Sequence, residues 1–262
     1  MDSNEKLEEV HQEISPSKKQ KFIQETKSIT LIIFLVLLFR SVFFEPFRIP
    51  TGSMIPTLLI GDFILVNKFS YGFKVPFSDW EVPFLNISGD PKYLFGESKP
   101  KRGDVIVFKF PNDRATNYIK RVVATSGDTI EIVDKELYVN GKKVLTKSLD
   151  GTTQSKDILD DMDDRFKRYD LKLLSSDTGK AKHVIQFNKN DPTNSYYPKT
   201  VVPEGKYFVM GDNRDFSYDS RIWGFVDHKL VKGKAIFVWF SMILPFENPF
   251  KFRPWRIGNS ID

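Results

Sequence analysis

A serine between two prolines is the residue of this chain that best suits a nucleophile. Ser53 follows Gly52, and Pro50 and Pro56 hold the surrounding backbone extended or turned. A serine hydroxyl attacks a carbonyl group efficiently only when a base takes its proton. Because Gly-Ser pairs are common in loops, this segment predicts catalysis only together with a suitable base.

The composition narrows the choice of that base. The chain has no cysteine, which excludes disulfides, thiolate metal sites and a cysteine nucleophile. It has three histidines, His11, His183 and His228, and none of them has the spacing of a metal-binding pair such as H-E-x-x-H. Hydrolytic chemistry in this chain must therefore largely do without histidine and zinc, which leaves carboxylates and lysines.

A lysine can act as a base only while its amine is neutral. The ordinary lysine pKa is about 10.4, so removing the proton near neutral pH costs about 4 to 5 kcal/mol unless apolar surroundings disfavour the charged form. Lys68, Lys109 and Lys120 all lie in strand-like apolar runs, so burial alone does not choose among them. On a strand, Lys120 shares its face with Tyr118 and Val122.

The first element that must position these residues is an apolar segment near the N-terminus. Residues 1–27 are polar and end in a cluster of lysines, and an almost uncharged run follows. We predict a transmembrane anchor over residues 28–47, with residues 1–27 in the cytoplasm, because lysines favour that side. A buried core helix or a removable secretory signal is the alternative, but the polar lead is long and bulky residues stand where small cleavage-site residues are expected.

The chain after this segment contains many short strand patterns. Asn140-Gly141 is a strong signal for a two-residue hairpin turn. Residues 141–200 are more polar and resemble an insertion, whose acidic run 157–164 lacks the ligand spacing of a calcium loop and favours a solvated helical face. The apolar C-terminal segment 235–252 is either a core strand with a tail or a surface that rests on lipid. Strands are predicted at 63–67, 104–110, 118–125, 129–133, 136–139, 183–187, 206–210 and 234–240.

Five short motifs follow one another between about residues 45 and 226. Together, and in this order behind an apolar segment, they resemble the motifs of type I signal peptidases, the bacterial leader peptidases that use a serine and a lysine. The matching stretches are TGSM with PTL at 51–58, GD with VNK at 61–68, RGDVIVF at 102–108, YIKR with GD at 118–128, and GDNRD with S, DSR and WG at 211–224.

The resemblance implies a membrane-bound serine endopeptidase that removes signal peptides from secretory precursors after a small-x-small motif. It implies that Ser53 is the nucleophile and Lys120 the general base. Thr51 stands where the family commonly has a serine whose hydroxyl joins the oxyanion hole, and threonine keeps that donor. The family's mechanism needs no metal and no cofactor.

The same resemblance implies supporting roles for other residues. Ser217 aligns with the serine that hydrogen-bonds the catalytic lysine, and Asp219 and Arg221 align with a structural ion pair. An extended substrate would pair with a strand edge and place alternate side chains in shallow pockets. We expect the wall of these pockets to comprise Ile49, Met54, Leu58, Tyr118 and Ile119.

The implied fold is mainly β, with antiparallel sheets, behind one N-terminal transmembrane helix. The catalytic β core would comprise residues 48–140 and 201–262, and residues 141–200 would be an inserted, non-catalytic β-rich region. The implied location is the bacterial inner membrane, crossed once, with the N-terminus cytoplasmic and the catalytic domain on the periplasmic side. The expected partners are secretory precursors and membrane lipid; the net charge of +5 comes without a nucleic-acid-binding motif, so we expect no nucleic acid partner.

Two other functions compete with this one. A self-cleaving Ser/Lys protease of the repressor type shares the serine and lysine but would be soluble and carry a DNA-binding module, so the apolar segment argues against it. A membrane-tethered β-domain that only scaffolds other proteins would need neither residue. The distance between the Ser53 hydroxyl and the Lys120 amine is the observation that best separates these functions.

Overall fold

A computed structural model of the chain describes residues 17–79, 81–82, 87–150, 152, 158, 166, 168–178, 182–243 and 250–261. Residues 1–16, most of the acidic run 157–164 and both prolines of the C-terminal segment lie outside the described residues. The chain divides into two units, residues 1–41 and 42–262.

The first unit consists, in its described part, of helix α2, Lys18–Val42. A capping box starts the helix: the Gln20 N–H donates to Ser17 Oγ (3.3 Å), and the Ser17 N–H donates to Gln20 Oε1 (2.9 Å). The helix is long and apolar enough to cross a membrane by length and composition.

The bounds of α2 differ from the predicted anchor of 28–47 at both ends. The helix starts earlier because lysine, glutamine and glutamate at its beginning are good helix formers. It ends earlier because Phe44–Arg48 forms a strand, and Pro46 could not continue a helix without the loss of a hydrogen bond.

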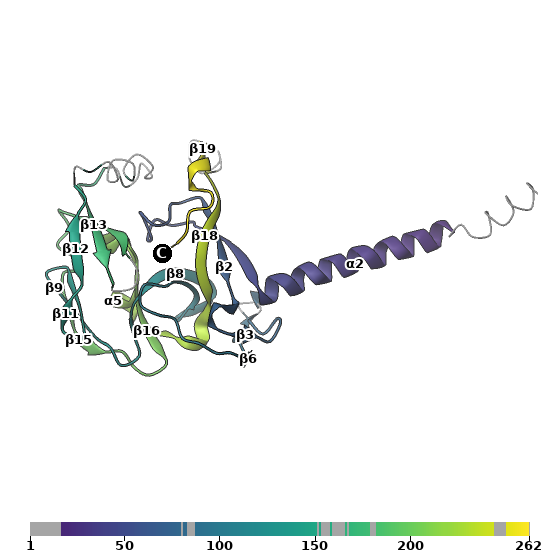
Figure 1. The fold of residues 1–262 in the computed structure, drawn as a ribbon, viewed down its shortest axis with the longest axis horizontal. Coiled ribbons are helices and arrows are strands. Elements are labelled where there is room, and N and C mark those ends of the chain that lie inside the picture. Colours follow the sequence, from purple (N-terminus) through teal and green to yellow (C-terminus); the bar gives the residue numbers. More distant parts are fainter. Residues whose placement is uncertain are drawn as a thin grey trace, which may run out of the picture. The chain divides into compact units, whose positions relative to one another are not determined.

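The second unit is built from antiparallel sheets, with β2 and β18 on one side and β9, β11 and β15 on the other in Figure 1. The chain is therefore mainly β behind one N-terminal apolar helix, which confirms the predicted fold class. The largest sheet has eight strands. In spatial order they are β1 (Phe44–Arg48), β2 (Asp62–Asn67), β18 (Val231–Ile243), β7 (Val105–Phe110), β8 (Asp113–Thr125), β16 (Lys206–Met210) and β17 (Val226–Asp227), with β19 (Lys251–Phe252) paired to β18.

Two smaller sheets lie beside it in the same unit. One has the order β11 (Lys142–Lys143), β10 (Glu136–Val139), β9 (Thr129–Val133) and β15 (Tyr197–Val201), and the other has the order β12 (Leu145–Ser148), β13 (Leu171–Asp177) and β14 (Lys182–Asn188). The other elements of the described residues are the strand pairs β3 (Phe73–Lys74) with β6 (Tyr93–Phe95) and β4 (Glu81–Val82) with β5 (Ile87–Ser88), the short helix α5 (Ser220–Trp223), and the 3₁₀ turns η1 (Phe69–Tyr71), η2 (Arg214–Phe216), η3 (His228–Leu230) and η4 (Pro254–Arg256).

The predicted strands 129–133, 136–139 and 206–210 coincide with β9, β10 and β16. Asn140 and Gly141 have φ values of 53° and 72°, as the tight turn between β10 and β11 requires. The first two of these strands lie in the four-stranded sheet and not in the eight-stranded one. The structure therefore begins a separate sheet at Thr129, earlier than the predicted insertion of 141–200, while the division into domains stays a prediction.

The hydrophobic core fixes the loop that carries the candidate nucleophile. Met54 and Leu58 of the loop between β1 and β2 are fully buried and pack in one cluster with Ile64, Val107 and Val238 of the large sheet. Each such side chain contributes about 1.5 to 3 kcal/mol by its removal from water. The loop is thus a packed part of the core.

A buried carboxylate ties the end of this loop to the C-terminal segment. Asp62 accepts hydrogen bonds from the Leu59 N–H (2.8 Å) and the Ser241 hydroxyl (2.7 Å), and it forms an ion pair with Arg256 (2.6 Å). Because the Asp62 side chain is fully buried, these donors replace the water it loses. The loop is therefore fastened at the point where β2 begins.

Candidate active site

The structure brings Ser53 and Lys120 into hydrogen-bond contact. Ser53 lies on the loop between β1 and β2, Lys120 projects from β8, and 2.7 Å separates the Ser53 Oγ from the Lys120 Nζ. The two residues are only 9% and 4% exposed. Two groups that are 67 positions apart in the sequence thus form a buried pair.

Burial changes the acidity of the Lys120 amine. Loss of contact with water lowers the Lys120 pKa from 10.5 to about 8, although the nearby carboxylates of Asp219 and Asp212 partly oppose that change. The amine also donates to the Ile119 carbonyl oxygen (3.0 Å) and lies 5.4 Å from the centre of the Tyr118 ring. A substantial fraction of this lysine is neutral at mildly alkaline pH, which a general base requires.

The other two lysines left open by the sequence have different partners. Lys68 forms an ion pair with Asp79 (2.8 Å), and Lys109 donates to the Gly89 carbonyl oxygen. Both side chains are buried, so burial did not distinguish them from Lys120. The contact with Ser53 distinguishes Lys120 from the other two lysines.

Asn213 holds the backbone of the nucleophile. Its N–H donates to the Ser53 carbonyl oxygen (3.1 Å), and its side-chain amide donates to the Gly52 carbonyl oxygen (2.8 Å). Gly211 permits this approach, because a Cβ there would overlap the Ser53 carbonyl oxygen and the Ser217 side chain. The segment after β16 and the serine loop are therefore in direct contact.

A fully buried ion pair fixes that segment in turn. Arg121, next to Lys120 on β8, donates from Nε and Nη2 to the two carboxylate oxygens of Asp212 at 2.9 and 2.8 Å. The Thr57 hydroxyl donates to the same carboxylate (2.6 Å). Burial by itself would raise the pKa of Asp212, but the guanidinium outweighs it and lowers that pKa to about 2. The carboxylate is therefore ionised wherever the protein is folded near neutral pH.

Asp219 and Arg221 form an ion pair beside the site. Arg221 donates from Nε and Nη2 to Asp219 at 2.8 Å each, and the Gly211 N–H donates to the same carboxylate (2.9 Å). Asp219 opposes the loss of charge at Lys120 but does not touch it, since the two hydrogen bonds of that amine go to Ser53 and Ile119.

Ser217 lies close to the pair without bonding the lysine. Its side chain is buried beside Gly211. Burial by itself would raise the pKa of the Asp219 carboxylate, but Arg221 outweighs it and lowers that pKa, and the Ser217 hydroxyl adds a smaller contribution in the same direction. In the described part of the chain the Ile119 carbonyl, and not Ser217, is the second partner of the Lys120 amine. The lysine-orienting role of Ser217 stays a prediction.

Thr51 is exposed, two residues before the nucleophile. Neither its hydroxyl nor the backbone N–H of Ser53 donates to another described residue. Two donors, one on the nucleophile itself and one two residues before it, are thus available to a ligand.

The five residues of the predicted pocket wall differ in their exposure, and their contact with a substrate stays a prediction. Ile49, Met54 and Leu58 are at most 2% exposed and belong to the core described above. They point inward because the loop must bury its aliphatic side chains against the sheet. Tyr118 and Ile119 keep partly exposed side chains, so of the predicted wall these two are accessible to a substrate.

Several residues that shape the site were given no such role by the sequence. Thr57, Arg121 and Asn213 stand inside the recognised motifs, but only their contacts show that they hold the loop. Phe166, from the predicted insertion, packs against Ile55 and Leu59, and its ring lies where a Cβ on Gly52 would stand. No local pattern connects Phe166 with the serine, because the contact is entirely tertiary.

Comparison with known proteins places the chain among peptidases. Residues 22–240 match the family described as signal peptidase, peptidase S26. Signal peptidase I of Pseudomonas aeruginosa is 39% identical over 239 residues, which cover 86% of this chain and 75% of that protein. Signal peptidase I of Buchnera aphidicola subsp. Schizaphis graminum is 38% identical over an alignment of 275 positions, gaps included, that covers 92% of this chain and 82% of that protein.

A solved structure is also similar in sequence. The signal peptidase I from Enterococcus faecalis V583 is 29% identical, and the match covers 52% of this chain and 97% of that one. The TM-score is 0.30, which is too low for a comparison of the two architectures.

The contact between Gly52 and Phe166 predicts the effect of an added methyl group. We expect Gly52→Ala to lower the free energy of unfolding by about 1 to 3 kcal/mol, because the new Cβ overlaps the Phe166 ring. The measurement is urea denaturation of the detergent-solubilised chain. Adding Phe166→Leu should recover part of the loss, since leucine lacks the outer ring atoms; a Gly52→Ala protein as stable as the parent would show that the ring does not lie there.

Proposed function

The chain belongs to the signal peptidase family, peptidase S26, and is a serine endopeptidase that removes signal peptides from secretory precursors; we propose that Ser53 is its nucleophile and Lys120 its general base. The observation that supports this assignment is the 2.7 Å contact between a buried hydroxyl and a buried amine. A scaffold protein would have no use for this contact, and the likeness to signal peptidases leaves the repressor-type protease without support.

In the proposed mechanism the neutral Lys120 amine accepts the Ser53 proton as Oγ attacks the scissile carbonyl carbon. The resulting ammonium returns the proton to the leaving amine, and the neutral amine then activates a water molecule that hydrolyses the acyl-enzyme. With a pKa of about 8, deprotonation of this lysine at pH 7 costs about 1 kcal/mol, compared with about 5 kcal/mol at the ordinary value.

The charge that develops on the carbonyl oxygen needs donors that are already in place. We assign this role to the backbone N–H of Ser53 and the hydroxyl of Thr51, which have no other acceptor among the described residues. Such donors act on the transition state more than on the ground state, and removal of one typically costs a factor of about 10² to 10³ in rate.

The substrate is proposed to bind as an additional strand. Residues 117–120 of β8 pair with β7, while the pairs between β8 and β16 lie at Arg121 and beyond. The free edge beside Lys120 can therefore accept an extended peptide, and Tyr118 and Ile119 would contact its side chains. Small residues at the cleavage position and two positions earlier would allow the peptide backbone to approach Ser53 closely.

We further propose that α2 crosses the bacterial inner membrane once, with the N-terminus cytoplasmic and the second unit on the periplasmic side. The lysines at the start of the helix favour the cytoplasmic side. Tethering the enzyme to the membrane that holds its substrates would raise their effective concentration. Lipid is a proposed partner as well, since Trp239, Phe250, Phe252 and Trp255 are more than 40% exposed.

Cleavage of a secretory precursor peptide by the detergent-solubilised full-length chain tests the catalytic pair. We expect Ser53→Ala and Lys120→Met each to lower the rate by a factor of about 10⁴ or more, because each removes one half of a coupled proton transfer. Lys92→Met is the matched control, since that lysine is exposed on the same domain. Full activity in either site variant, with the fold intact by circular dichroism, would refute the assignment.

The pH dependence of the rate provides a separate test. Burial lowers the pKa of Lys120 to about 8, so the neutral, reactive amine accumulates as the pH rises through 8. The plot of kcat/KM against pH should rise about tenfold per pH unit below pH 8 and level off above it. A rise centred near 10.5 would mean that the base is an ordinary, solvated lysine.

Thr51 allows the oxyanion role to be tested by a pair of matched substitutions. Thr51→Val keeps the shape of the side chain and removes its donor, so we expect kcat to fall about 10²-fold with little change in KM. Thr51→Ser keeps the hydroxyl and should retain most of the activity. Equal rates in these two variants would exclude the hydroxyl from the oxyanion hole.

A further inference from the structure

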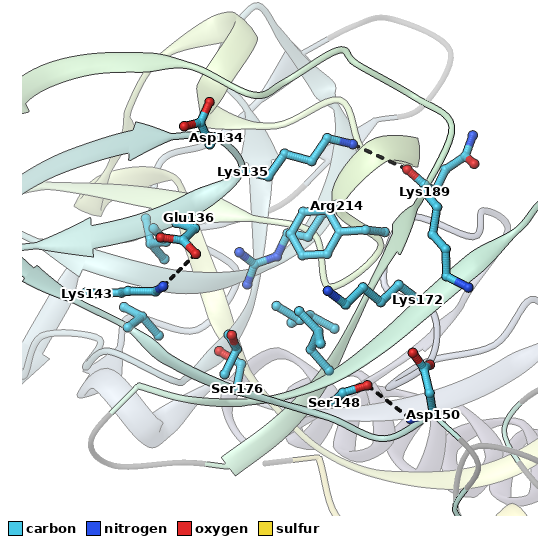
Figure 2. A pocket seen from close by; sticks show the side chains of 17 residues that line it. Asp134, Lys135, Glu136, Lys143, Ser148, Asp150, Lys172, Ser176, Lys189 and Arg214 are labelled. Atoms are coloured by element: carbon cyan, nitrogen blue, oxygen red, sulfur yellow. Dashed lines mark hydrogen bonds and ion pairs between the residues drawn. The ribbon is translucent and has the colours of Figure 1, made fainter.

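A cavity of about 680 Å³ lies between the two smaller sheets. Figure 2 shows the side chains that line it, which come from β10 to β14 and from η2. Neither Ser53 nor Lys120 is among them. Its volume is within the range of about 300 to 1,000 Å³ that is usual for small-molecule sites.

The most buried charge of the lining is the guanidinium of Arg214. The residue is 2% exposed, and Figure 2 shows the guanidinium in the middle of the lining side chains. Its one side-chain hydrogen bond among the described residues is a weak contact of 4.0 Å with the Met210 sulfur, and its Nε has no partner there. Burial lowers the Arg214 pKa to about 10, so the group stays charged near neutral pH.

Burying a guanidinium that has almost no hydrogen-bond acceptors costs free energy, unless a bound anion supplies those acceptors. Arginine presents five N–H donors in a fork that fits a phosphate or carboxylate. Asp212 and Asp219 offset part of its charge from a distance, whereas Arg221 and Arg121 add to the positive potential. None of the described carboxylates forms an ion pair with Arg214; Asp212 pairs with Arg121 and Asp219 with Arg221.

A second cation faces the same space. Lys172, on β13, extends its amine into the cavity in Figure 2, and it has no ion pair within the described part of the chain. The other three lysines of the lining each have a carboxylate partner: Lys135 with Asp215, Lys143 with Glu136 and Lys189 with Asp170.

The acidic side chains of the lining do not cancel these two cations. Five basic and three acidic residues line the cavity, and two of the basic ones are paired with carboxylates outside the lining. Glu136 is already bonded to Lys143, and Figure 2 shows Asp134 and Asp150 toward opposite edges of the view. The centre of the cavity is therefore the place where an anion is most stabilised.

Of the nine uncharged residues in the lining, five are apolar and four are polar. Leu137, Val144, Leu174, Ile185 and Phe187 supply hydrocarbon surface from both sheets. A bare inorganic anion would leave that surface in contact with water. A ligand with an anionic head and an apolar body would satisfy both kinds of lining.

We propose that this cavity binds a small organic anion, with its phosphate or carboxylate head between Arg214 and Lys172 and its apolar body against Leu174 and Phe187. The site is separate from the peptidase reaction and does not depend on the roles assigned to Ser53 and Lys120. The proposed site would make ligand binding a function of the strands β10 to β14, which lie between β9 and β15 in the sequence.

Titration calorimetry of the full-length chain in detergent tests the proposal, with phenyl phosphate and benzoate as the probes. We expect saturable binding of at least one of them, with one site per chain, and the tighter probe identifies the head group. Inorganic phosphate and phenol should each bind at least about tenfold more weakly than the tighter probe, since each lacks either the apolar body or the anionic head of the ligand. If neither probe binds, or if phenol binds as tightly as phenyl phosphate, the anion site does not exist.

Substitutions on exposed strand positions locate the binding without endangering the fold. Lys172→Met should weaken the binding about tenfold, and Lys172→Glu should weaken it further, because each removes a charge-assisted contact. Lys147→Met is the matched control: Lys147 lies on β12 between Thr146 and Ser148, whose side chains line the cavity, so its own side chain points to the other face. Unchanged affinity in both Lys172 variants would overturn the proposal.

One further variant separates this cavity from the peptidase site. Ser53→Ala should bind the probe with the affinity of the parent chain, because Ser53 is not part of the lining. Loss of binding in that variant would place the probe at the catalytic pair and refute the second site.

Discussion

The contact between Ser53 and Lys120 requires an amine that is kept away from water. A solvated lysine is protonated near neutral pH and cannot accept a proton from a serine, so the pair can work only inside the protein. Lys120 lies on β8, where it pairs with Ile106 of β7, and its side chain is buried while its Nζ still reaches the serine. The sheet order is therefore the condition for the chemistry.

A lowered pKa makes the Lys120 amine a useful base only if the serine hydroxyl is held within hydrogen-bond distance of it. The partner is fixed here by Asn213, which binds the backbone of the serine loop, and by the ion pair of Arg121 with Asp212 next to it. Buried ion pairs seldom add net stability, since the loss of hydration offsets the attraction between the charges. This one connects β8, the serine loop and the segment after β16 at a single point, and positioning is the benefit that its geometry supports.

The smaller sheets share the core of the catalytic sheet and add features of their own. Ile130 and Leu137 pack with Phe208 of β16 in one buried cluster, so the two regions are not independent layers. Phe166 covers Gly52 beside the nucleophile, and Arg214 directly follows the asparagine that holds the serine loop. The region that the sequence marks as polar and turn-rich therefore contacts the catalytic loop and contains a charged cavity.

Local chemistry in the sequence determined the strand patterns, the turn at Asn140 and the kind of chemistry available to a chain without cysteine, while Ser53 and Lys120 were assigned from the resemblance of five ordered motifs to those of signal peptidases. Tertiary structure decided the rest, because burial and contact depend on residues far apart in the chain. Lys68, Lys109 and Lys120 look alike as sequence, and only the packed sheet brings one of them to the serine. Met54 lies beside the nucleophile in the sequence, yet it turns into the core, since a loop side chain goes where the sheet offers apolar surface and no local pattern reveals that direction.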